Sequence, residues 1–150
     1  MLCIFAYIYS LKHFFTMKDI ITKEAFFNSN IDTVWSAITQ QDEISKWFLK
    51  ADFKAEEGYN YSFQSPDDNC APIIGTVIKA DPFTLIYTWI IKGTDIETTV
   101  KWQLETANNG TKLNLTHSGI ANYKEENVIK MFESFSGGWD NCIEGLTTYL

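Results

Sequence analysis

The C-terminal segment 122–150 has the periodicity of one long amphipathic helix. Its apolar residues recur at alternating spacings of four and three, which places them on a single helical face. They are Val128, Phe132, Phe135, Trp139, Cys142, Leu146 and Tyr149. Gly137 and Gly138 interrupt this run, and each costs roughly 1 kcal/mol relative to alanine inside a helix. We therefore expect a helix that bends over a cavity, or that another backbone or a ligand approaches closely.

Periodic and alternating apolar residues also predict the elements that precede this helix. Asn30 is a suitable N-cap for a first short helix, and Asn122 with Glu125 resembles a capping box that starts the long one. A second short helix is expected around Ile44, Trp47 and Phe48. Strands are expected over residues 20–27, 59–64, 73–79, 84–91, 96–105 and 111–118, with a hairpin turn at Asn108, Asn109 and Gly110. This order predicts an α+β fold in which one curved antiparallel sheet wraps around the C-terminal helix.

Length and charge narrow the class of protein. A chain of 150 residues is most simply one domain with a substantial core. Its net charge is −7 and it contains no arginine, so nucleic acid is not an expected partner. Cys3, Cys70 and Cys142 are far apart in the sequence, which favours free thiols in a reducing cytoplasm. We expect no cofactor and no metal ion, because no Cys/His spacing suits one.

The apolar segment 1–16 lies outside the pattern of the remaining chain. A signal peptide would carry an earlier positive charge and a cleavage site, and a membrane span would need about 20 apolar residues. Lys12 and His13 interrupt the segment too early for a span. We favour the interpretation that the start codon was assigned upstream of the natural one. The domain then spans residues 17–150. If it is translated, the segment is expected to pack on the domain or to mediate association.

Aromatic residues make up 15% of the chain, which is high for a closed core of this size. A cavity lined by rings with a few polar atoms is the usual picture of a small-molecule site. Some of these rings must also belong to the core. The candidate ligand-binding residues are Trp47, Phe48, Tyr61, Phe63, Tyr87, Trp89, Trp102, His117, Phe132, Phe135 and Trp139.

His117 allows two interpretations. It shares the inward parity of its strand with Leu113 and Leu115, so it is either a core histidine with a hydrogen-bond partner or a polar group in an apolar pocket. The acidic pairs of the chain look like solvated surface, and no pair of carboxylates is placed for acid/base work. We therefore predict no catalytic residue.

Several short sequence motifs, taken in their order along the chain, resemble those of one protein family. They are Val34 to Thr39, Lys46-Trp47-Phe48, Gly75-Thr76-Val77, Leu85 to Trp89, Gly110 to Leu113, Thr116 to Gly119, Gly138-Trp139 and Leu146 to Leu150. Together they resemble the START-like superfamily (SRPBCC, the helix-grip fold of the birch-pollen allergen). More narrowly, they are similar to the family of the activator of the 90-kDa heat-shock protein ATPase. The resemblance covers about residues 20–150.

The resemblance implies a hydrophobic cavity between the sheet and the last helix, with ligands that differ among members. Our first hypothesis is non-catalytic binding of a small apolar or aromatic molecule. The alternatives are a chaperone-associated stress-response protein, and a cyclase or aromatase-type enzyme that uses His117. We expect a cytoplasmic monomer or weak homodimer without a membrane partner.

Overall fold

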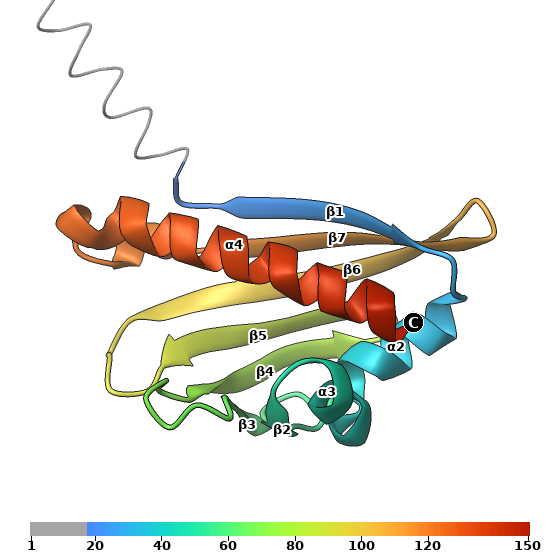
Figure 1. The fold of residues 1–150 in the computed structure, drawn as a ribbon, viewed down its shortest axis with the longest axis horizontal. Helices are drawn as coiled ribbons and strands as arrows, with labels where there is room; N and C mark the ends of the chain where they lie inside the picture. Colours follow the sequence, from blue (N-terminus) through green and yellow to red (C-terminus); the bar gives the residue numbers. More distant parts are fainter. Residues whose placement is uncertain (1–17) are drawn as a thin grey trace, which may run out of the picture.

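The computed structural model describes residues 18–150, and the apolar segment 1–16 lies outside them. A first strand is followed by two short helices, six further strands and one long helix (Figure 1). The elements are β1 (Ile21–Phe27), α2 (Ile31–Thr39), α3 (Gln41–Trp47), β2 (Lys50–Asp52), β3 (Asn60–Gln64), β4 (Ile73–Asp81), β5 (Thr84–Ile91), β6 (Glu97–Ala107), β7 (Gly110–Ser118), the 3-10 helix η1 (Ile120–Asn122) and α4 (Glu125–Tyr149). The predicted helix-grip arrangement is confirmed.

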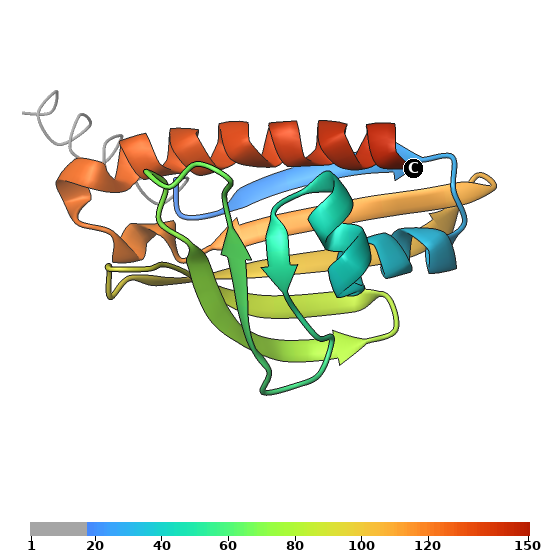
Figure 2. The ribbon, with the colours of Figure 1, turned by 60° about the horizontal axis from the view of Figure 1, so that its bottom comes forward.

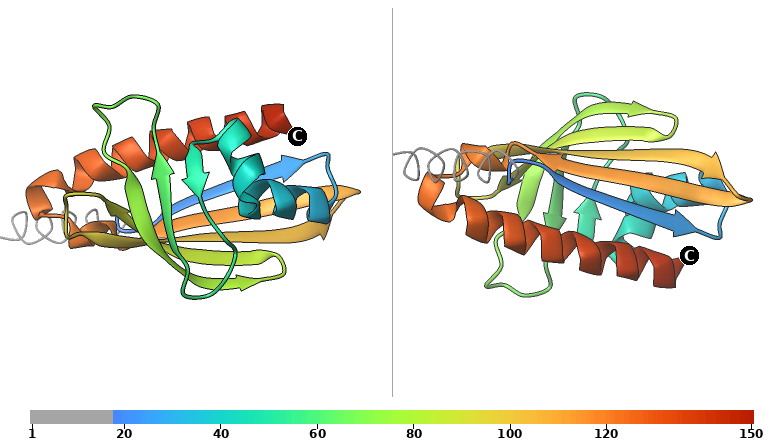
Figure 3. Two further views of the ribbon diagram at one scale, coloured as in Figure 1. Left: turned by 90° about the horizontal axis from the view of Figure 1, so that it is seen from below. Right: turned by 90° about the horizontal axis from the view of Figure 1, so that it is seen from above.

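All seven strands belong to one antiparallel sheet in the order β1-β7-β6-β5-β4-β3-β2. Alternation along β6 buries Thr98, Val100 and Trp102 on the face towards α4, as predicted. The sheet curves strongly, so that β2 and β3 run at a steep angle to β1 (Figures 2 and 3). This curvature produces a concave face, and the core fills the space between that face and the helices.

α4 lies across the concave face and follows the edge strand β1 along its length (Figures 1 and 3). Lys23 of β1 holds the two elements together, because its Nζ lies 2.8 Å from an Asp140 carboxylate oxygen and donates a 2.9 Å hydrogen bond to Ser136. At the C-terminal end of α4, the Tyr149 hydroxyl donates to the Glu43 carboxylate of α3 at 3.2 Å. These contacts hold α4 against β1 and α3.

Local sequence explains where most elements begin and end. The Asn30 side chain accepts a hydrogen bond from the Thr33 backbone N–H at 2.8 Å, so it is the predicted N-cap of α2. Asn108 and Asn109 both have positive φ, which suits a two-residue hairpin turn, while Gly110 already belongs to β7. The structure also contains the three-residue strand β2, which we did not predict.

The predicted capping box at Asn122 and Glu125 is wrong. Asn122 ends η1, and its side-chain amide donates to the Glu97 carbonyl at 2.9 Å. Helix α4 begins at Glu125, after Lys124, whose side chain makes no capping hydrogen bond. The glutamates of the first turn still carry charge of the sign that a helix N-terminus favours.

Of the alternatives expected at Gly137 and Gly138, the close approach of another backbone is excluded. Both glycines are exposed within an uninterrupted helix, and a Cβ atom added to either would meet no atom within 4 Å. A close approach of this kind occurs instead at Gly75 of β4, where a Cβ would collide with the Thr88 backbone carbonyl.

Candidate functional site

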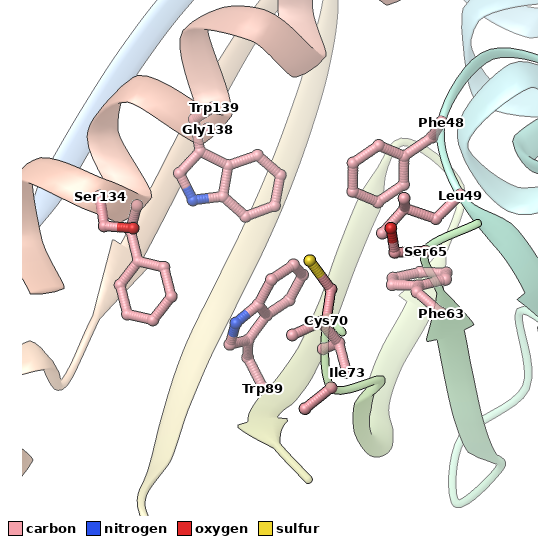
Figure 4. Close-up of a pocket in the computed structure, with 12 residues that line it drawn as sticks. Phe48, Leu49, Phe63, Ser65, Cys70, Ile73, Trp89, Ser134, Gly138 and Trp139 are labelled. Carbon is pink, nitrogen blue, oxygen red and sulfur yellow. The ribbon is translucent and has the colours of Figure 1, made fainter. Parts of the chain in front are cut away.

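A pocket of about 250 Å³ lies between α4 and the β3–β5 part of the sheet. Figure 4 shows Trp89 and Trp139 on one side of it, Phe48 and Phe63 on the other, and Cys70 between them. The lining residues are Phe48, Leu49, Phe63, Ser65, Cys70, Ala71, Ile73, Trp89, Ser134, Phe135, Gly138 and Trp139. None of these side chains is charged, so the pocket suits a neutral ligand.

The loop between β3 and β4 forms one wall of the pocket mouth. Its conformation follows from local hydrogen bonds: the Ser65 hydroxyl accepts from the Asp67 N–H at 3.1 Å, and the Asp67 carboxylate accepts from the Asn69 N–H at 3.0 Å. The Asp67 carbonyl accepts from the Cys70 N–H at 3.0 Å. These turns are typical of serine and aspartate side chains. They bring the exposed Cys70 thiol beside the aromatic rings.

Some of the predicted binding residues line this pocket and some do not. Those that do are Phe48, Phe63, Trp89, Phe135 and Trp139, and those that do not are Trp47, Tyr61, Tyr87, Trp102, His117 and Phe132. The Trp47 indole N–H donates to the Ala37 carbonyl at 2.8 Å and so joins α3 to α2. Phe132 is half-buried, and the Lys18 ammonium lies 4.5 Å from the centre of its ring.

The tyrosines of the predicted set belong to a closed layer of the core. The Tyr61 hydroxyl donates to the Thr88 carbonyl at 2.5 Å, and the Tyr87 hydroxyl accepts from the Trp102 indole N–H at 2.9 Å. Burial raises the pKa of both phenols. Burial likewise raises the pKa of the nearby Cys142 thiol to about 12. These groups therefore stay protonated at neutral pH.

His117 lies at the centre of a hydrogen-bond chain that joins α4 to three strands. The Trp139 indole N–H donates to His117 Nδ1 at 3.0 Å, so the ring proton of neutral His117 is on Nε2. Nε2 lies 2.7 Å from the Thr98 hydroxyl, which donates in turn to the Trp89 carbonyl at 3.1 Å. Both ring nitrogens are thus occupied by side chains.

The protonation state of His117 follows from its surroundings. The residue is fully buried, and burial lowers its pKa from 6.5 to about 4. None of the side chains in hydrogen-bond or ring contact with it carries a charge; they are Thr98, Trp89, Phe135 and Trp139. Of the two interpretations offered by the sequence, the geometry favours a core histidine with satisfied hydrogen bonds.

Comparisons with known proteins agree with this fold. The sequence model described as "Activator of Hsp90 ATPase homolog 1-like protein" matches residues 28–150. The chain belongs to this family. The resemblance inferred from the sequence is therefore confirmed. No curated protein matches the chain significantly.

Solved structures similar to this family member come from several bacteria. Protein BH1534 of Bacillus halodurans is 29% identical, with 87% of this chain and 95% of that one covered and a TM-score of 0.70. Protein MLL2253 of Mesorhizobium loti is 24% identical, with the same coverage and a TM-score of 0.77. The Aha1 dimer of Colwellia psychrerythraea is 18% identical, with 85% and 92% covered and a TM-score of 0.67.

Several pocket residues of this activator-of-Hsp90-ATPase-like chain were not among the predicted site residues. They are Leu49, Ser65, Cys70, Ala71, Ile73, Ser134 and Gly138. Most belong to connecting segments that have no apolar periodicity, so only the turn residues of 65–69 could have marked the mouth. Gly138 is different, because its place inside an apolar helical face was itself a signal.

The described part of the chain contains no candidate metal site and no candidate membrane-spanning helix. Residues 18–150 contain no group of three or more His, Cys, Asp or Glu side chains that could hold a metal ion. Over the same residues, no helix is long and apolar enough to cross a membrane.

Proposed function

We propose that this domain binds a small, neutral, largely aromatic molecule in the pocket between α4 and the sheet. The observation that carries the proposal is an uncharged pocket with rings on opposite sides, Trp89 and Trp139 facing Phe48 and Phe63. Aromatic walls of this kind favour stacked and edge-to-face contacts with a planar ligand. Removing the apolar surface of such a ligand from water contributes roughly 25 cal/mol per Å².

The size of the pocket limits the ligand. Pockets for drug-sized molecules usually enclose roughly 300–1,000 Å³. A volume of about 250 Å³ lies just below that range, so a molecule of two or three fused rings is the expected occupant. Larger lipids or sterols would have to extend beyond the pocket mouth.

The arrangement of titratable groups supports binding rather than catalysis. His117 does not line the pocket, and its ring nitrogens are engaged by Thr98 and Trp139. A general base must reach the proton that it abstracts, directly or through one water. The enzyme hypothesis based on His117 is therefore less well supported than binding.

The neighbouring glycines of α4 provide a sharp test. A Cβ atom added at either position meets no atom within 4 Å apart from the adjacent residues and the helix backbone, so both variants should fold. Gly138 lines the pocket and Gly137 does not. With tetralin or fluorene as the probe, ligand binding should raise the melting temperature of the wild type and of Gly137→Leu by mass action. Gly138→Leu should lose this shift.

Two outcomes would contradict the proposal. One is that neither tetralin nor fluorene shifts the melting temperature or binds in calorimetry. The other is that Gly138→Leu responds to the probes as strongly as Gly137→Leu. Native mass spectrometry of the protein purified from its own host would add the mass of a retained ligand.

Contact with a chaperone is a second candidate function, and the description of the matching family favours it. The test is the ATPase rate of the host's 90-kDa heat-shock protein with and without micromolar amounts of the domain. Stimulation by wild type and Gly138→Leu alike would assign the effect to a surface away from the pocket. An unchanged rate would remove this candidate.

A further inference from the structure

Two buried polar groups beside the pocket have no hydrogen-bond partner among residues 18–150. They are the Trp89 indole N–H and the Tyr123 hydroxyl. Both residues are only 7% exposed. Buried donors are nearly always paired in proteins, because an unpaired donor loses its hydrogen bonds to water without replacement. An unpaired group of this kind therefore calls for an explanation.

Both groups belong to rings that pack around Phe135 of α4. The ring centre of Phe135 lies 6.4 Å from that of Trp89 and 6.0 Å from that of Tyr123. Phe135 itself lines the pocket and is half-buried. Figure 4 shows the Trp89 nitrogen on the side of its ring that faces Ser134, the neighbour of Phe135 in α4. Phe135 thus lines the pocket and contacts the ring of each donor, and Trp89 lines the pocket beside it.

The surroundings of the pair contrast with those of His117. The His117 ring also packs on Phe135, at 4.6 Å between centres, but both of its nitrogens have partners. The Tyr123 phenol remains a donor at neutral pH, since burial raises its pKa. The Trp89 indole N–H can only donate and the neutral Tyr123 hydroxyl can donate or accept, so an uncharged acceptor satisfies either group.

We propose that Phe135 covers a polar subsite of the pocket, in which the Trp89 N–H and the Tyr123 hydroxyl donate to the carbonyl oxygen of an aromatic ketone. The Phe135 side chain turns aside when the ketone enters. This inference rests on the proposed ligand-binding function and specifies the chemistry of the ligand. It also explains why two donors are left unpaired next to an otherwise apolar pocket.

A matched pair of probes tests the subsite. 1-Tetralone and tetralin have the same two-ring skeleton and differ in one carbonyl group. The ratio of their dissociation constants in each protein variant isolates the contribution of that carbonyl, whatever the variant does to the shape of the pocket. Each donor should favour the ketone by roughly threefold to tenfold.

Two variants test the two donors separately, and a third serves as a control. Tyr123→Phe and Trp89→Phe keep a ring and remove a donor, so the preference for 1-tetralone should fall in each. Tyr149→Phe removes a hydroxyl that contacts Glu43 far from the pocket, and it should leave the preference unchanged. The carbonyl stretching frequency of bound 1-tetralone should rise in Tyr123→Phe relative to the wild type, because a hydrogen bond lowers it.

Tyr123→Phe has a second readout that does not depend on binding. Because the hydroxyl has no partner to lose, its removal should leave the melting temperature of the ligand-free protein unchanged or higher. A clear drop would mean that the hydroxyl has a structural hydrogen bond, and it would overturn the proposal.

The outcomes of the binding test are distinct. If both probes bind equally well in the wild type and the carbonyl frequency does not shift, the subsite is wrong while the proposed binding function stands. If 1-tetralone, tetralin and fluorene all fail to bind, both proposals fail. Phe135→Ala should bind 1-tetralone faster than the wild type, since no ring has to move; an unchanged association rate would show that Phe135 does not cover the subsite.

Discussion

The part of α4 before Gly137 and the part after Gly138 pack on the same sheet but bury their apolar faces to different degrees. In the second part, Trp139, Cys142 and Leu146 are 3%, 6% and 0% exposed. In the first part, Val128 is 4% exposed, but Phe132 and Phe135 are only half-buried. The closed part rests on satisfied hydrogen bonds such as that from Trp139 to His117, whereas the two unpaired donors lie around Phe135.

This difference separates tightly packed residues from less buried ones, although Trp139 both packs tightly and lines the pocket. A tightly packed segment opens only with the whole domain, while a less buried one can move locally at lower cost. We therefore expect the first part of α4 to be the part that adjusts when the proposed ligand binds. The second part keeps the helix on the sheet while it does so.

Truncation of one apolar residue in each part should give the largest contrast. Leu146→Ala removes a fully buried side chain and should lower the free energy of unfolding by about 2–5 kcal/mol. Phe132→Ala removes a larger but half-buried ring and should cost about 1–2 kcal/mol. Urea unfolding of both variants measures the two values. Equal losses would show that the two parts of the helix are packed to the same degree.

Acid should lower the free energy of unfolding, because His117, in the closed part of the core, is protonated more readily once the chain unfolds. Its pKa is about 4 in the folded protein and about 6.5 in the unfolded chain, so the unfolded chain binds the extra proton between these values. The contribution of neutral His117 is complete above about pH 6.5 and is lost as the pH falls towards about 4. The loss amounts to about 3 kcal/mol. Urea unfolding at a series of pH values measures it.

His117→Gln is the control for this effect. Glutamine retains a donor and an acceptor for Thr98 and Trp139 but does not titrate. Its stability should depend less on pH in this window than that of the wild type, while acidic surface groups affect both proteins alike. The same pH dependence in both proteins would assign the acid sensitivity to other groups.

Much of the fold could be predicted because a half-buried strand or helix carries its burial pattern in its sequence. The alternation of β6 and the apolar face of α4 are both correct. The strand Lys50–Asp52 is too short to show a period and forms through its pairing with β3, where Ala51 lies opposite Phe63. The capping box failed because the Asn122 amide bonds to Glu97 of β6, a tertiary contact.

The site was less accessible to sequence reasoning. Parity indicates which face of the sheet a residue is on, but it does not indicate whether a cavity or another side chain covers it there. His117 faces inward as predicted, and Trp102 is buried too, yet both lie in a closed layer outside the pocket wall. Cys70 reaches the mouth through a loop held by Ser65 and Asp67, and no periodic signal marks such a position.

Gly137 and Gly138 mark the boundary between the two parts of α4. Because an added Cβ meets no atom within 4 Å, the double change to alanine should raise the free energy of unfolding by about 2 kcal/mol through helix propensity alone. Thermal unfolding measures this gain in stability. The association rate of tetralin measures whether the substitutions slow ligand binding. If the first part needs the glycines in order to adjust, tetralin will associate more slowly with the stabilised variant. An unchanged association rate would show that movement of the first part does not depend on them.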